Sequence, residues 1–152
     1  MTKDLTLLVF RFLLVAIFPV SAYYKVVQWP RVAAEVAGAG VPYAYQLSMI
    51  GTLAELLLPF FVILGIWTGW AAFGLILYVA AATYIGHPVW SVPPEAFFPA
   101  LMSFMKNLGM IGGLLVLIVF GPGRLALQRT DDGGASRGNA THGDEAEPAA
   151  SA

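Results

Sequence analysis

Four long apolar stretches separated by short polar segments dominate the chain. They cover about residues 5–27, 47–67, 70–87 and 104–121. A helix needs roughly 20 apolar residues to cross the hydrocarbon core of a bilayer, so each stretch is close to the length of one membrane span. The turn at residues 65–69 is short, which makes the second and third spans antiparallel neighbours. The pattern predicts an all-α fold, a polytopic membrane four-helix bundle with short loops.

The polar segment at residues 28–42 leaves two interpretations open. Trp29 is a residue type that favours the depth of the lipid headgroups, and Pro30 suits the first turn of a short helix. The Gly-Val-Pro sequence at 40–42 would end such a helix. One interpretation is therefore an interfacial helix, and the other is a plain loop.

Prolines and glycines around the last span indicate where its helix begins and how it packs. Pro94 suits the opening of a helix, so the fourth helix can begin before Phe104 and bend near Pro99. The glycines at 109 and 113 form a G-x-x-x-G pair, which allows another backbone to approach closely. We expect a packing face there.

The polar residues of the first span lie on one helical face with apolar ones. Arg11, Phe18, Ala22 and Lys25 are separated by offsets that return to within about 40° at 100° per residue. This face should point into the bundle. Arg11 and Lys25 lie about 21 Å apart along the axis, in opposite halves of the membrane. Arg11 also interrupts what would be the apolar region of a signal peptide, so we expect the span to be retained.

Composition supports a membrane protein and excludes several cofactors. The 152 residues are 59% hydrophobic and 11% charged, with a mean hydropathy of +0.76, which is far more apolar than a soluble domain. Cysteine is absent, which excludes disulfides, Cys-ligated zinc, iron–sulfur clusters and c-type haem. The histidines are His87 and His142, so neither a bis-His haem nor a metal site is predicted. If electrons pass through this protein, their carrier is a bound quinone or a cofactor of a partner.

The charges divide the chain into two regions. Residues 1–127 carry six Lys and Arg against four Asp and Glu, whereas residues 128–152 carry two against five. We expect the first region to be the membrane domain and the second to be a disordered acidic tail, because it has almost no apolar anchors. Neither region has the clustered basic stripe that nucleic-acid binding needs.

Four spans place both termini on the same side of the membrane. Lys3, Arg124 and Arg129 flank the bilayer on that side, against Arg31 and the inward-placed Lys25 and Lys106 on the other. This bias predicts cytoplasmic termini.

Glu55 is the single ionisable residue of the second span. An unpaired carboxylate in hydrocarbon costs several kcal/mol, so Glu55 must be neutral, paired or turned towards a polar interior. The basic candidates within apolar runs are Arg11, Lys25, Lys106 and, if protonated, His87. The axial distance from Glu55 is about 9 Å to both Arg11 and Lys25, so spacing does not choose between them.

These groups have a structural and a functional interpretation. In the first, charge pairs fix the register of the helices. In the second, a pocket open to the outer half of the membrane binds an anionic or quinone-like head group, and Glu55 accepts a proton. The candidate catalytic residues are then Glu55, Lys106 and His87, and the candidate cofactor-binding residues are Lys25, Arg11 and Asn107.

The sequence resembles the DoxX family of small four-helix membrane proteins over residues 7–123. The resemblance rests on the order and spacing of its motifs: Arg11, Phe18 and Lys25, Gly40-Val41-Pro42, Glu55 and Gly65, Ala71-Ala72, His87 and Trp90, Lys106-Asn107, and Gly112-Gly113-Leu114-Leu115. The chain departs from the family pattern at Ala22, where glycine is usual, and in its long acidic tail.

The resemblance implies a bacterial inner-membrane protein that is a component of an oxidoreductase. Relatives are subunits of thiosulfate:quinone oxidoreductase or partners in membrane complexes for oxidative-stress and thiol defence. The leading hypothesis is a quinone-linked subunit, or the membrane partner of a soluble or membrane redox protein, with its site at Lys25, Glu55, His87 and Lys106.

Two other functions stay open. The protein can be a non-catalytic scaffold that recruits soluble enzymes to the lipid bilayer, and it can form a homo-oligomer. A small-solute or proton conductor built on Glu55 is the third hypothesis, although four short helices without an inverted repeat do not suit a transporter.

Overall fold

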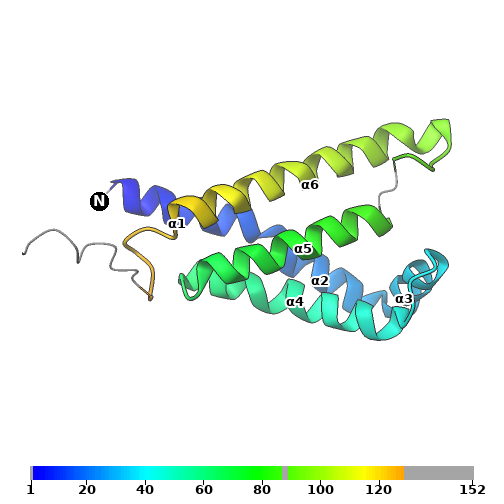
Figure 1. The fold of residues 1–152 in the computed structure, drawn as a ribbon, viewed down its shortest axis with the longest axis horizontal. Helices are drawn as coiled ribbons and strands as arrows, with labels where there is room; N and C mark the ends of the chain where they lie inside the picture. The colour runs from blue at the N-terminus through cyan, green and yellow to red at the C-terminus, as the bar shows by residue number, and fades with distance from the viewer. Residues whose placement is uncertain (1, 87–88, 129–152) are drawn as a thin grey trace, which may run out of the picture.

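The computed structural model describes residues 2–86 and 89–128, and this part of the chain is helical without any strand (Figure 1). Four helical segments are long and apolar enough to cross a membrane: Lys3–Val27, Ala44–Leu64, Thr68–Gly86 and Pro94–Phe120. The predicted all-α bundle of four spans is therefore confirmed. The helices are α1 (Thr2–Val15), α2 (Ile17–Val27), α3 (Trp29–Gly38), α4 (Ala44–Leu64), α5 (Thr68–Gly86) and α6 (Pro94–Phe120).

The first span consists of two helices, α1 and α2, where the sequence pattern predicted one continuous helix. A turn at Ala16 separates them. Pro19 explains the interruption, because it has no N–H to donate to the carbonyl of Val15, four residues earlier, and its ring crowds that carbonyl. The span still runs without a gap from Lys3 to Val27.

The segment after the first span forms the interfacial helix rather than the plain loop. Helix α3 begins at Trp29 with Pro30 in its first turn, as the position of that proline favours. None of its residues is buried. Arg31 Nε donates to Glu35 Oε1 at 3.0 Å on its exposed surface, and this hydrogen bond raises the pKa of Arg31.

The second span, α4, begins and ends about three residues earlier than the predicted range of 47–67. Gly65 ends it in the left-handed conformation (φ 72°), and the N–H of Ile66 donates to the carbonyl of Phe61 at 3.0 Å. The last helix, α6, begins at Pro94, which confirms that the fourth helix starts before Phe104.

The helices pack in a fixed order around a small core. Helix α4 contacts α1, α2, α3 and α5, whereas α6 packs along α5 and touches α1. The core is formed by Val15, Phe18, Val62, Ala71, Ala72, Leu75, Val79, Leu114 and Leu117. Large apolar side chains cover the outside of every span, as expected of a surface that faces acyl chains.

The first span and the last span each have a predicted packing face. Arg11, Phe18 and Ala22 are all almost completely buried, which confirms the inward face of the first span. For the glycine pair, Gly113 lies against α1, where an added Cβ would come within 2.6 Å of Leu14. Gly109 has no heavy atom of another element within 4 Å of such a Cβ, so only one of the two glycines is used in this packing.

Candidate functional site

Three polar side chains from three helices meet inside the bundle. Lys25 of α2 donates from Nζ to Glu55 Oε2 of α4 at 2.6 Å. Tyr78 of α5 donates its hydroxyl to the same oxygen at 2.7 Å. Lys25 Nζ also donates to the Tyr78 hydroxyl oxygen and lies 4.9 Å from the centre of its ring. We call Lys25, Glu55 and Tyr78 the polar triad.

Burial differs between the members of the polar triad. The Glu55 side chain is 3% exposed, whereas that of Lys25 is 24% exposed. Burying a carboxylate is costly unless it is paired and hydrogen-bonded, and Glu55 has both an ion pair and a phenolic donor. Lys25 is therefore more accessible than Glu55 to a ligand or a proton.

Gly51 explains how the Tyr78 side chain reaches α4. A Cβ on Gly51 would lie 3.3 Å from Cε2 of Tyr78, so the ring passes across α4 at a position without a side chain. Glu55 follows one helical turn later, which places its carboxylate beside the phenol. Phe18 of α2 packs edge-on against the Tyr78 ring, with the ring centroids 6.4 Å apart.

The structure decides between the two candidate partners of Glu55. Lys25 forms the ion pair with Glu55, near the middle of α4, whereas Arg11 lies at the C-terminal end of α4. Arg11 is fully buried (0% exposed) and donates to the backbone carbonyls of Val62 at 3.4 Å and Leu125 at 3.0 Å. The carbonyl end of a helix carries partial negative charge, which suits a guanidinium. Its predicted part in cofactor binding stays a prediction.

Residues 125–128 close the same end of α4, and we call them the C-terminal clasp. Leu127 N donates to Leu64 O at 3.0 Å, and Gln128 N donates to Gly65 O at 3.3 Å. The Gln128 side chain accepts from Trp67 N at 2.8 Å. Together with Arg11, the clasp satisfies carbonyl groups that a helix end leaves without partners.

The remaining predicted site residues do not join the polar triad in the described part of the chain. Asn107 is buried and donates to Thr83 Oγ1 at 2.8 Å, between α6 and α5. Lys106 is exposed on α6, which packs on α5 and α1 and not on α2 or α4. Helix α5 therefore separates Lys106 from Glu55. His87 lies outside the described residues.

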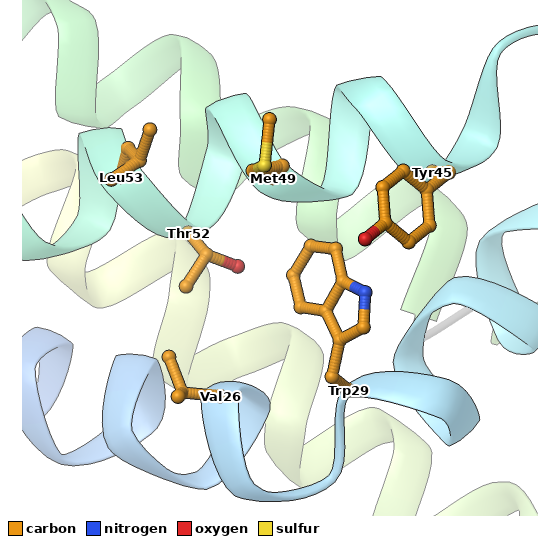
Figure 2. Close-up of a pocket in the computed structure, with 6 residues that line it drawn as sticks. All are labelled: Val26, Trp29, Tyr45, Met49, Thr52 and Leu53. Carbon is orange, nitrogen blue, oxygen red and sulfur yellow. The ribbon is translucent and has the colours of Figure 1, made fainter.

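At least two cavities open on the surface of the described bundle. The larger, about 290 Å³, lies between α2, α3 and α4 (Figure 2) and is lined by Val26, Trp29, Tyr45, Met49, Thr52 and Leu53. The second, about 240 Å³, lies between α5, α6 and the loop before α6, next to Thr83. Its lining residues Val26 and Thr52 are close in sequence to Lys25 and Glu55, but no member of the polar triad lines the larger cavity.

Tyr78 is the site residue that reasoning from sequence missed. A signal was present, since Tyr78 lies roughly 12 Å or more from either end of α5, whereas tyrosine in membrane proteins favours the interfaces. A tyrosine at mid-span beside a lone carboxylate is a candidate hydrogen-bond donor. Among the described residues no three Asp, Glu or His side chains form a group that could hold a metal ion.

A bundle of four apolar spans with an ion pair held between them defines a small polytopic membrane protein. The DoxX family model matches residues 6–88, more than half of the chain, and the chain belongs to the DoxX family. The matched region includes all three members of the polar triad and ends before Lys106 and Asn107.

The chain is also similar to the inner membrane protein YphA of Escherichia coli (strain K12). The two are 28% identical over 127 residues, which cover 84% of this chain and 91% of that protein. With the four apolar helices, this similarity supports a multi-pass protein of the inner membrane. No solved structure is significantly similar to the chain.

Proposed function

We propose that this protein is a quinone-linked membrane subunit of an oxidoreductase and that Glu55 exchanges protons with the quinone. Reduction of a quinone to a quinol takes up two electrons and two protons. The electrons would come from a soluble or membrane redox partner that oxidises a thiol or thiosulfate. The chain's own contribution would be to bind the head group and to move protons.

The polar triad is the observation that carries this proposal. Glu55 is a proton acceptor held inside an apolar bundle, and it shares hydrogen bonds with an ammonium group and a phenol. A proton can therefore move among three groups without crossing hydrocarbon. Lys25, which is partly exposed, would bind a carbonyl oxygen of the head group.

The other predicted residues enter this proposal with separate roles. Lys106, which is exposed near the middle of α6, would attract an anionic partner or head group, together with His87, whereas the buried Asn107 would hold α6 on α5 through Thr83. Arg11 would hold the inner end of α4. Both termini are proposed to be cytoplasmic.

Quinone reduction in membrane vesicles tests the proposal. Vesicles containing the full chain and its native partners would receive thiosulfate or a dithiol and a short-chain quinone, and the rate of quinol formation would be measured. We expect Glu55→Gln to lower this rate at least tenfold, because it removes the carboxyl group that would take up protons from the aqueous side and pass them to the quinone as it is reduced. Glu35→Gln is the matched control, since Glu35 is exposed on α3. Equal rates for the Glu55→Gln variant and the unmodified protein would overturn the proposal.

A non-catalytic scaffold is the second candidate. The absence of cysteine favours it, because the chain has no thiol for redox chemistry of its own. In this case the polar triad only holds the helices together. Purification of the full chain with a bound soluble enzyme and without quinone, unchanged by Lys106→Ala, would support the scaffold and contradict the quinone-linked subunit.

A further inference from the structure

Lys106 carries a charge in the middle of a membrane span, on the outer surface of the bundle. Its side chain is exposed, and at 1.5 Å per residue it lies about 18 Å from Pro94 and about 21 Å from Phe120, the two ends of α6. The stem of a lysine extends roughly 6 Å, whereas the headgroups begin about 15 Å from the midplane of a bilayer. In a span centred in the bilayer, the Lys106 ammonium therefore lies in hydrocarbon, where a charge without a partner is costly.

No acidic side chain in the described part of the chain pairs with Lys106. The described acids are Asp4, Glu35, Glu55 and Glu95. Glu55 is bound to Lys25 on the other side of α5, and the others stand on α3 or in the first turns of α1 and α6. The acids of residues 128–152 belong to a polar sequence that does not favour hydrocarbon. The anion that Lys106 needs must therefore come from another molecule.

The surface around Lys106 is suited to close contact with another helix. Helix α6 lies at the edge of the bundle, where it packs on α5 and touches α1 (Figure 1). An added Cβ on Gly109 or on Gly112 would meet no heavy atom within 4 Å, so both glycines leave the α6 backbone uncovered. Small residues of this kind let the backbone of a second membrane helix approach. Within an arc of about 120° at 100° per residue, this side of α6 carries exposed residues that we call the lysine face: Met102, Met105, Lys106, Gly109, Gly112 and Val116.

We propose that the lysine face binds a transmembrane helix of another protein, and that an aspartate or glutamate at the middle of that helix pairs with Lys106. The two glycines admit the backbone of the partner helix, and its carboxylate supplies the anion that the lysine needs in hydrocarbon. This site goes beyond the proposed redox function, because it needs neither Glu55 nor a quinone.

A second copy of this chain does not supply that carboxylate. Two copies in one membrane have the same orientation, so a two-fold contact through the lysine face brings both Lys106 side chains to the same depth. Their like charges repel each other in a medium of low dielectric constant. No described acid is exposed at the middle of a span, where it could pair with Lys106 of another copy.

Binding of designed membrane helices tests the lysine face. The full chain, labelled with a fluorophore through Leu127→Cys, would be reconstituted in phosphatidylcholine vesicles with a labelled peptide of roughly 20 leucine and alanine residues that has glutamate at its centre. Energy transfer between the two labels measures association, and a peptide with glutamine at its centre is the reference. We expect about a tenfold preference for the glutamate peptide, which is the strength of polar contacts between model membrane helices.

Variants of the chain locate this preference on the lysine face. Lys106→Gln should bind the two peptides equally, whereas Lys106→Arg should keep the preference because it keeps the charge. Lys3→Gln is the control, since it removes a lysine at the end of the first span, and it should also keep the preference. Gly109→Leu should weaken the binding of both peptides about fivefold by covering the backbone. The bundle tolerates this change, because the space next to Gly109 is open.

Equal binding of the two peptides by the unmodified protein would overturn the proposal, as would a preference that survives Lys106→Gln. Loss of the preference on addition of phosphatidylglycerol would also overturn it, because Lys106 would then be paired with a lipid phosphate. Energy transfer between two labelled copies of the chain that Lys106→Gln abolishes would replace the partner protein by a second copy.

Discussion

Lys25 supplies the positive charge that makes the Glu55 carboxylate stable inside the bundle. Glu55 is much more deeply buried than Lys25, so the two residues are not equivalent. Loss of Lys25 leaves a charge on the buried partner, whereas loss of both charges leaves two neutral groups. The difference between these cases measures how strongly the pair depends on its charges.

A double-mutant cycle should show this dependence. We expect Lys25→Met to lower the free energy of unfolding in mild detergent by about 3 kcal/mol, because it strands the carboxylate. The double variant Lys25→Met, Glu55→Gln should lose less than the Lys25→Met variant alone. Thermal or denaturant unfolding measures both values. If the two single effects simply add in the double variant, the side chains do not interact as the structure describes.

The sequence predicted that Glu55 needs a partner but could not name it. Arg11 and Lys25 lie at equal axial distances from Glu55, so only the register between the first span and α4 separates them. That register depends on where α3 returns the chain to the membrane and on the break at Ala16, and neither can be read from spacing. Tyr78 was missed because a hydroxyl within an apolar run does not alter its hydropathy pattern.

At the scale of the elements, the end of α4 is the most constrained point of the fold. Gly65 has a positive φ, and a Cβ there would lie 2.4 Å from the Ala126 Cβ and 2.7 Å from Arg11 Nη1. Three separate parts of the chain, α1, α4 and the C-terminal clasp, therefore meet at one residue without a side chain. This contact explains why a turn residue is packed as tightly as the core.

Substitution of Gly65 by alanine should disrupt this junction. We expect Gly65→Ala to lower the free energy of unfolding by at least about 2 kcal/mol, from left-handed strain and from displacement of Ala126 and Arg11. Gly69→Ala is the control, because Gly69 is helical in α5 and has nothing within 4 Å of an added Cβ. Thermal unfolding of both variants gives the comparison. Equal stabilities would show that the junction is looser than described.

The sequence predicted the elements better than their ends. Hydropathy identified all four spans, since lipid-facing surfaces require continuous apolar runs. Hydropathy alone placed the start of the fourth span near Phe104, whereas Pro94 indicated the earlier start that α6 has, because proline is tolerated in the first turn of a helix. The sequence did not predict the break at Ala16, because Pro19 lies within an unbroken apolar stretch.

At the scale of the whole molecule, the two ends of the bundle differ in chemistry. Figure 1 shows the C-terminal clasp and α3 at opposite ends of the bundle. Arg11 lies at the clasp end, and the larger cavity lies at the end that carries α3. The polar triad lies between them. The excess of cations at the clasp end predicts that this end faces the cytoplasm, and that the larger cavity faces the other side.

Cysteine labelling can test this orientation cleanly, because the natural chain has no cysteine. Leu127→Cys, at an exposed position of the C-terminal clasp, should react with a membrane-impermeant maleimide only after the cells are permeabilised. Ala39→Cys, just after α3, should react in intact cells. The opposite pattern would reverse the predicted orientation without affecting the fold.

In the proposed function, Glu55 gains and loses a proton during turnover. Infrared difference spectroscopy of the full complex in lipid, recorded as a dithiol and a quinone are supplied, measures this directly. We predict a band from a protonated carboxyl that appears during quinone reduction and is absent in the Glu55→Gln variant. A spectrum without such a band, or one in which the band persists in Glu55→Gln, would contradict the role assigned to the polar triad.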